Sequence, residues 1–169
     1  KHLNLDLPYF ERQIPTSENV ARVLWDKLQA QPDIGTLQRL SLYEDEDLCA
    51  DLTAEAGPEV ASVTRRYSFT AVHDGHRGHT WDLFVSVHGP IDRETGMVTD
   101  IVALDHLLKE RVLVPFDGRD LRMVLATPSV TGEYLAKAVW DRIVSAIPAG
   151  TLQLVKLVQT RDLFYEYAG

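Results

Sequence analysis

The sequence predicts an α+β protein in which helices cover one face of an antiparallel sheet, and three observations support this class. Apolar and polar residues alternate with a period of two in 67–73 and again in 79–88, which predicts two strands that each bury one face. The short segment DGHRG between them predicts an antiparallel hairpin. Beyond the hairpin the apolar residues adopt helical spacing, so strands and helices are segregated along the chain.

The composition limits the class of protein. The 169-residue chain is 45% apolar, which is enough for one or two modest domains with a core. A net charge of −8 without any basic stripe argues against nucleic-acid binding. The chain has no run of 18 apolar residues and no signal-peptide pattern, so we expect a cytoplasmic protein that does not span a membrane. The single cysteine, Cys49, permits no intramolecular disulfide and fits a reducing compartment.

The chain contains an internal repeat. VARVLWDKL at 20–28 matches LAKAVWDRI at 135–143, an offset of 115 residues, and the GTLQ segments that follow keep the same offset. The repeat predicts that residues 1–52 are the C-terminal half of a first module, 53–58 a linker and 59–169 a complete second module. Half a module leaves sheet edges and a helix face unpaired, so we expect an upstream half-module in the parent protein.

The elements of each copy follow from their patterns. Thr16 or Ser17 caps a predicted helix in PTSENVARVLWDKLQ, and a strand is predicted at 37–44 with a short strand after it. In the second copy the hairpin precedes a helix near 100–113, a helix at about 131–147 and a last strand pair. The predicted order is therefore β-β-α-α-β-β for each module.

Two histidines at the hairpin predict a metal site. His73 ends the first strand and His79 begins the second, both on the apolar face, so the two are cross-strand neighbours about 5 Å apart. Two imidazoles that converge at the mouth of an apolar sheet suit a metal such as zinc. The alternative is a pair of histidines whose nitrogens are satisfied within a polar core.

Glu44 is a candidate ligand anchor. It is in phase with Leu40 and Leu42, which places it on the predicted buried face, where an unpaired carboxylate is costly. A planar ligand edge with two adjacent N–H donors would pair with it bidentately. The alternative is a solvated carboxylate at a wet strand end. The corresponding residue of the second copy is Gln159, whose amide suits a donor–donor edge poorly.

These motifs resemble the 6-pyruvoyltetrahydropterin synthase and 6-carboxytetrahydropterin synthase family. The resemblance rests on F-x-A-x-H at 69–73, G-H-x-W at 78–81, D-x-x-T-G-M-V-x-D at 92–100, KHLN at 1–4 and PTSEN at 15–19. It implies the T-fold, in which the sheets of several subunits join into a barrel-shaped ring with pterin sites at the interfaces. It also implies a zinc ion held by three histidines and a glutamate that anchors the N–H edge of the pterin ring.

The resemblance assigns roles to particular residues. His73 and His79 match two of the three zinc positions, and Glu44 matches the pterin anchor. Thr16 and Gln159 complete the expected substrate-binding set, with Gln159 as a weakened counterpart of Glu44.

The second module also departs from the family pattern. Arg77 stands at the third zinc position, where a guanidinium opposes a cation, and His76 beside it is the expected substitute. The loop between the histidines has no cysteine, whereas family enzymes carry one there. The family's catalytic Asp-His pair appears as Asp117-Gly118, so only Asp117 remains as a catalytic candidate. The complete module therefore resembles a catalytically decayed copy.

Two functions from different classes follow from this. The first is a zinc-dependent lyase that acts on dihydroneopterin triphosphate in queuosine or tetrahydrobiopterin biosynthesis, as a homo-oligomeric ring. The second is a non-catalytic protein that binds a pterin or completes the ring. Glu44 and PTSEN favour the enzyme, and the departures in 59–169 favour the second function for that module.

Overall fold

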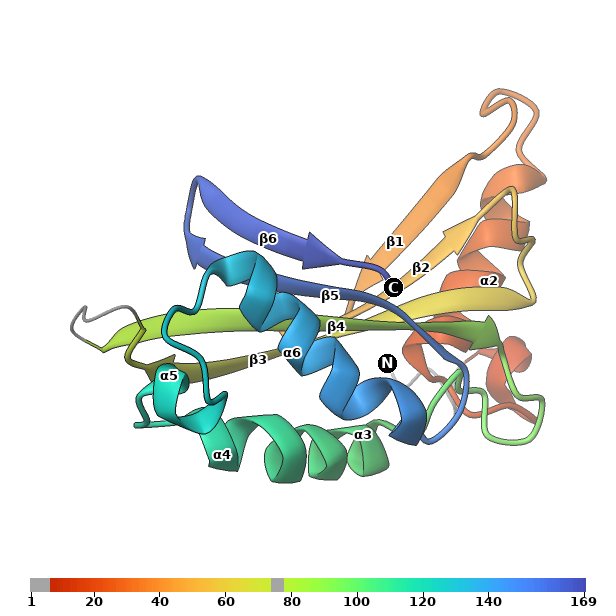
Figure 1. Cartoon of the computed structure of the whole chain (residues 1–169). Coiled ribbons are helices and arrows are strands. Elements are labelled where there is room, and N and C mark those ends of the chain that lie inside the picture. The colour runs from red at the N-terminus through yellow and green to blue at the C-terminus, as the bar shows by residue number, and fades with distance from the viewer. Residues whose placement is uncertain (1–6, 74–77) are drawn as a thin grey trace. The chain divides into compact units, whose positions relative to one another are not determined.

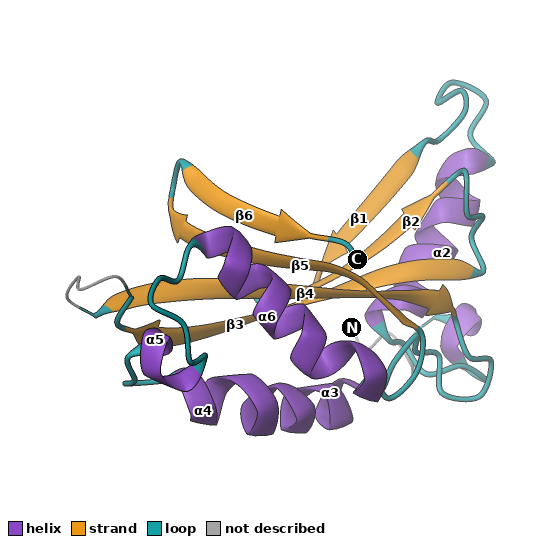
Figure 2. Ribbon diagram, viewed as in Figure 1, coloured by secondary structure: helices purple, strands orange, loops and turns teal. Residues whose placement is uncertain are grey.

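The computed structural model describes residues 7–73 and 78–169, and its strands form one antiparallel sheet (Figure 2). The strands lie in the sheet in the order in which they follow one another along the chain. Together with the segregated helices, this arrangement confirms the predicted α+β class. The strands are β1 (Arg39–Tyr43), β2 (Leu48–Thr53), β3 (Val60–Ala71), β4 (His79–Pro90), β5 (Thr151–Thr160) and β6 (Leu163–Tyr167).

Both helices predicted in the second copy are present, and in each of them the turns before a proline depart from α-helical geometry. The helix predicted at 100–113 is α-helical at 101–108, π-helical at 109–113 and α-helical again to Phe116. Its π-helical turn precedes Pro115, which lacks an N–H group and disturbs the preceding turn. The helix predicted at 131–147 ends at Ile143, a 3₁₀ turn follows, and Ile147 before Pro148 is not helical. The helical segments are η1 (Pro8–Phe10), α2 (Ser17–Gln29), α3 (Ile101–Leu108), η2 (Lys109–Leu113), α4 (Val114–Phe116), α5 (Leu121–Val124), α6 (Gly132–Ile143) and η3 (Val144–Ala146).

The chain divides into two compact units that share β3 and β4. The N-terminal unit comprises residues up to Thr64 together with Val87–Thr99, and the C-terminal unit comprises Arg65–Ser86 together with Asp100–Gly169. The division cuts across both long strands, whereas the predicted modules were delimited by the sequence repeat. The predicted boundaries at 52 and 59 therefore stay a prediction.

In the N-terminal unit α2 packs against β1 and β2 (Figure 1). The predicted cap is confirmed at Thr16, whose hydroxyl oxygen accepts a hydrogen bond from the backbone N–H of Asn19 at 3.2 Å. β1 and β2 pair in a register that places Leu42 opposite Ala50. The helix contributes Ala21 and Trp25, four residues apart on one helical face, to the buried core of this unit.

In the C-terminal unit α6 packs against β5 and β6 (Figure 1). Thr131 caps α6 by accepting a hydrogen bond from the backbone N–H of Tyr134, and the register of β5 and β6 places Leu157 opposite Tyr165. Both features repeat those of the N-terminal unit at the 115-residue offset. The predicted alternation in the hairpin is also confirmed, because the following residues are buried: Phe69, Ala71, Trp81, Leu83 and Val85.

Among the described residues, no helix combines the length and the apolar character that crossing a membrane requires.

Candidate functional site

Glu44 lies directly after β1 in the N-terminal unit, and its carboxylate is exposed. The prediction that it belongs to a buried face was wrong, because Leu40 and Leu42 are only half-buried and the strand ends before the carboxylate is covered. Its oxygen Oε2 accepts a hydrogen bond of 2.6 Å from the hydroxyl of Ser17, at the start of α2. The carboxylate is therefore held in place by one neutral donor and remains open to solvent and to further donors.

The N-terminus of α2 is tied to the loop that carries the T-G-M-V motif. The hydroxyl of Thr16 donates a hydrogen bond of 2.5 Å to the carbonyl oxygen of Gly96 while it caps the helix. Gly96 has a φ of +74°, and a Cβ atom there would overlap the side chain of Asn19. The Thr16 hydroxyl therefore donates its one hydrogen bond to Gly96, and the hydroxyl that donates to Glu44 is that of Ser17.

Glu18 is buried beside this cluster, with 5% of its surface exposed. Its oxygen Oε1 accepts a hydrogen bond of 3.0 Å from the backbone N–H of Val98. Burial raises the pKa of Glu18 above the ordinary carboxyl value of 4.5, and the negative charge of Glu44 adds to the effect in a minor way. Glu18 was not predicted as a site residue. Its counterpart Glu133 follows the same T-x-E pattern and is exposed. The loop at Val98 that covers Glu18 is distant in the sequence, so no local signal distinguishes the two glutamates.

Replacing Glu18 by glutamine is expected to stabilise the protein at neutral pH relative to the wild type. A carboxyl group whose pKa is raised on folding favours the folded state below about pH 4.5, and this contribution is lost as the pH rises through the raised pKa. The glutamine keeps an acceptor for the backbone N–H of Val98 and carries no charge. The free energy of unfolding of the variant should therefore exceed that of the wild type by an amount that grows to about 1 kcal/mol between pH 4.5 and 8.

Urea unfolding at several pH values measures the difference between Glu18→Gln and the wild type. Glu133→Gln is the matched control, because this exposed glutamate holds the same place in the second repeat and should show no such trend. A constant difference for Glu18→Gln from pH 4 to pH 8 would contradict the assigned cause.

The second candidate cluster lies in the C-terminal unit, where the structure brings His73 and His79 together. Their ring centroids are 6.3 Å apart in an edge-on arrangement, and each lies 5.2 Å from the ring of Trp81. Nε2 of His79 lies 2.6 Å from the carbonyl oxygen of Gln159. A carbonyl oxygen only accepts, so Nε2 donates this hydrogen bond, which in a neutral imidazole leaves the lone pair on Nδ1. Histidines that bind metals are commonly oriented by such a bond to a carbonyl group.

The described residues fit a zinc ion only in part. His73 and His79 supply two imidazoles, but no group of three or more histidine, cysteine, aspartate or glutamate side chains suited to a metal occurs within 7–73 and 78–169. A tetrahedral zinc site needs three or four protein ligands. The predicted substitute ligand His76 and the opposing Arg77 lie outside the described residues.

Gln159 takes part in two contacts of the same cluster. Its backbone carbonyl oxygen is bound to His79, and its side-chain oxygen Oε1 accepts a hydrogen bond of 3.2 Å from the hydroxyl of Tyr165. Sequence reasoning did not single out Tyr165. Its counterpart in the first copy is Ala50, and this exchange of a methyl group for a phenol is a signal that the repeat itself contained.

Asp117 lies at the end of α4 and is exposed. Its oxygen Oδ1 accepts a hydrogen bond of 2.8 Å from the backbone N–H of Thr70, and Gly118 donates to the carbonyl oxygen of Thr70 at 2.7 Å. Gly118 has a φ of +69°, which favours glycine at the position of the family's histidine. The pair therefore fastens the end of α4 to β3.

Cys49 is free and buried in β2. Burial, with a contribution from Asp51, raises the pKa of the thiol to about 11. The thiol is therefore protonated at neutral pH and is a poor nucleophile.

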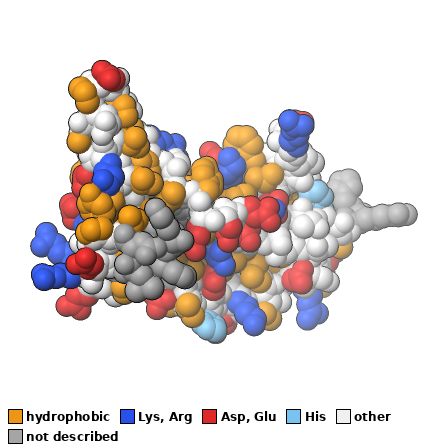
Figure 3. Space-filling model, turned by 180° about the vertical axis from the view of Figure 1, so that it is seen from behind, with side chains coloured by type: hydrophobic (Ala, Val, Ile, Leu, Met, Phe, Trp, Pro, Cys, Tyr) orange, Lys and Arg blue, Asp and Glu red, His pale blue; other side chains and the backbone are white. Residues whose placement is uncertain are grey.

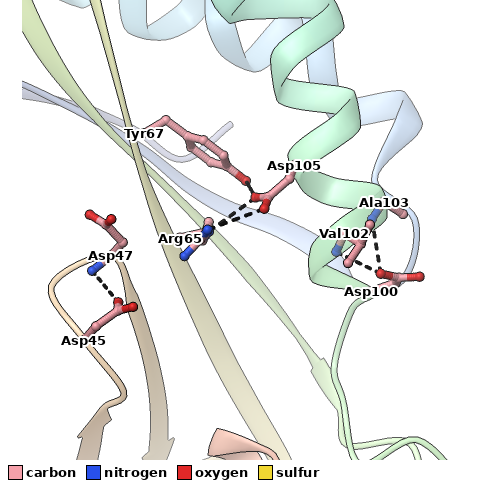
Figure 4. A network of polar contacts seen from close by, with 8 residues as sticks. All are labelled: Asp45, Asp47, Arg65, Tyr67, Asp100, Val102, Ala103 and Asp105. Atoms are coloured by element: carbon pink, nitrogen blue, oxygen red, sulfur yellow. Dashed lines mark hydrogen bonds and ion pairs between the residues drawn. The ribbon is translucent and has the colours of Figure 1, made fainter.

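A network of polar contacts joins β3 to α3 in the C-terminal unit (Figure 4). The guanidinium of Arg65 and the hydroxyl of Tyr67 both donate to the carboxylate of Asp105, at 3.2 and 2.8 Å to the same oxygen. Burial, and secondly the bond to Asp105, raises the pKa of Tyr67 well above its usual range. Arg65 is therefore a partner of Asp105 rather than a freely solvated cation. Elsewhere on the surface, acidic and basic side chains are intermixed, as the face in Figure 3 shows.

Comparison with known proteins gives matches to one family. The model of the family described as 6-pyruvoyl tetrahydropterin synthase matches residues 1–55 and 63–169. The 6-pyruvoyl tetrahydrobiopterin synthase of Homo sapiens is 31% identical over 134 residues, which cover 64% of this chain and 92% of that protein. The protein of the same name from Poecilia reticulata is 32% identical over 134 residues, which cover 65% of this chain and 91% of that protein.

A solved structure agrees with these matches. The 6-pyruvoyl tetrahydropterin synthase of Caenorhabditis elegans aligns with a TM-score of 0.60 at 23% identity, covering 65% of this chain and 96% of that one. At this level of identity the likeness concerns the fold, and it confirms the predicted T-fold.

Proposed function

Since this chain belongs to the 6-pyruvoyl tetrahydropterin synthase family, we propose that it acts in a carbon–oxygen lyase reaction on a dihydropterin triphosphate such as dihydroneopterin triphosphate. The observation that carries the proposal is the exposed carboxylate of Glu44, which Ser17 fixes at the N-terminus of α2. The named activity of the relatives supports the reaction class.

The carboxylate of Glu44 matches the edge of a pterin ring. The ring presents an amino group and a ring N–H side by side, and two parallel N–H···O bonds to one carboxylate are stronger and more directional than neutral hydrogen bonds. Ser17 occupies only one lone pair of Oε2, so both carboxylate oxygens still have acceptor capacity. In the proposed complex Glu44 binds and orients the ring.

Zinc enters the proposal through His73 and His79, with any further ligand lying outside the described residues. A zinc ion bound there would supply Lewis-acid assistance at the side-chain hydroxyls of the substrate. Because the described residues complete only part of such a site, we assign this chain the binding and orientation of the ring. A homo-oligomeric ring is also part of the proposal, and the two strands at the ends of the sheet order, β1 and β6, are the edges available for it.

A second candidate function is non-catalytic pterin binding or ring assembly. It is favoured by Gln159, the counterpart of Glu44. The backbone carbonyl oxygen and the side-chain oxygen of Gln159 both take part in hydrogen bonds within the protein. Both candidate functions include binding of the pterin ring at Glu44, and only the first includes catalytic turnover.

Replacing Glu44 by glutamine is expected to weaken the binding of neopterin by about 10- to 100-fold, measured by isothermal titration calorimetry. The amide turns one acceptor into a donor that faces the donor edge of the ring, and a charge-assisted pair is lost. Glu55→Gln is the matched control, since Glu55 is an exposed glutamate in the turn after β2 and should leave binding unchanged.

An assay of triphosphate release from dihydroneopterin triphosphate separates the two functions. Turnover that Glu44→Gln reduces supports the lyase, and neopterin binding without turnover favours the non-catalytic function. Absence of both binding and turnover in the wild type would refute the proposal, and binding that is unaffected by Glu44→Gln would remove Glu44 from it.

A further inference from the structure

Ser17, Glu44 and Ala50, a residue of β2, each have a counterpart 115 residues later in the chain. The local geometry is kept, because Leu42 lies opposite Ala50 in one unit and Leu157 lies opposite Tyr165 in the other. The chemistry, in contrast, has changed at all three positions. Ser17, Glu44 and Ala50 correspond in this order to Gly132, Gln159 and Tyr165.

Tyr165 contacts both of the other changed residues in the C-terminal unit. Its ring lies so close to Gly132, the first residue of α6, that a Cβ atom on Gly132 would overlap three ring atoms. Its hydroxyl donates to Oε1 of Gln159 at 3.2 Å. The phenol therefore fills the space between the start of the helix and the end of the strand.

The corresponding positions of the N-terminal unit, Ser17, Glu44 and Ala50, carry no aromatic ring. Ala50 contributes only a methyl group, which is buried in the sheet. The Ser17 hydroxyl takes the place of the missing Gly132 side chain and reaches Glu44, whose carboxylate is exposed.

We propose that Tyr165 occupies the C-terminal counterpart of the pterin site and closes it, so that each chain keeps one open pterin site, at Glu44. The inference rests on the proposed function. The three changes support one another. Gly132 leaves room for the phenol ring of Tyr165, which takes the place of the ligand's ring. The neutral amide of Gln159 accepts a hydrogen bond from the Tyr165 hydroxyl without placing a negative charge beside the ring.

The test restores the first copy's residues in the second. The variant Gly132→Ser/Gln159→Glu/Tyr165→Ala is compared with the wild type by the number of neopterin molecules bound per chain, from calorimetry and equilibrium dialysis. We expect one per chain for the wild type and two for the variant. Adding Glu44→Gln to the variant should leave one site, now in the C-terminal unit. If the triple variant does not fold, Gln159→Glu/Tyr165→Ala allows the same comparison, because it retains Gly132.

The outcomes distinguish the inference from its premise. A wild type that binds no neopterin refutes the proposed function. A wild type that binds one molecule through Glu44, combined with a folded variant that also binds only one, refutes the role of Tyr165 alone. A wild type that already binds two molecules per chain refutes it as well, because the second site would then be open with Tyr165 in place.

Discussion

Replacing Gly132 by alanine is expected to lower the free energy of unfolding by about 1–3 kcal/mol, the usual range for overpacking a filled space. A glycine-to-alanine change inside a helix normally stabilises a protein by about 0.5–1 kcal/mol. Gly132 is the first residue of α6 and its φ is not positive, so its backbone conformation suits alanine. The sign is reversed here because the new methyl group would overlap the ring of Tyr165. The ring must then move and give up its hydrogen bond to Gln159. Urea unfolding monitored by circular dichroism measures the change.

The control is the same substitution in a Tyr165→Ala background. Without the ring the methyl group has space, so Gly132→Ala should become neutral or slightly stabilising there. The difference between the two backgrounds is the interaction energy of the pair in a double-mutant cycle. Equal losses in both backgrounds would show that Tyr165 does not rest on Gly132.

Much of the fold was predictable because its signals are local. Alternation with a period of two located β3 and β4, and the shared residues of the repeat located α2 and α6. The differences concern the geometry of the last turns of two helices. Pro115 and Pro148 act on the turns that precede them, and apolar spacing alone does not register this.

The candidate site was less predictable, because its properties depend on distant segments. Phase along a strand placed Glu44 on a buried face, yet burial depends on what covers the strand end, and the carboxylate is exposed. Glu18 and Glu133 have the same local pattern and opposite burial, because the loop at Val98 covers only Glu18. The proximity of His73 and His79 was predictable from the alternation, although β3 ends at Ala71 and His73 lies two residues beyond the strand that it was predicted to end.

Truncating Trp81 to alanine is expected to cost about 3–5 kcal/mol of stability, the range for removing a buried aromatic side chain. Only 1% of its surface is exposed, and its ring contacts both His73 and His79. The space left behind lies beneath the two imidazoles, so their orientation should also loosen. Thermal and urea unfolding measure the loss, and the proton resonances of the histidine rings report the second effect.

Trp81→Phe is the informative comparison, because it keeps an aromatic ring and removes the indole N–H. That N–H is buried and has no hydrogen-bond partner among the described residues. A buried donor without a partner costs about 1–3 kcal/mol, which offsets the small cavity that phenylalanine leaves. We therefore expect Trp81→Phe to lie within about 1 kcal/mol of the wild type. A loss as large as that of Trp81→Ala would mean that the indole N–H is engaged in the folded protein, and that the space beside the two histidines holds an acceptor.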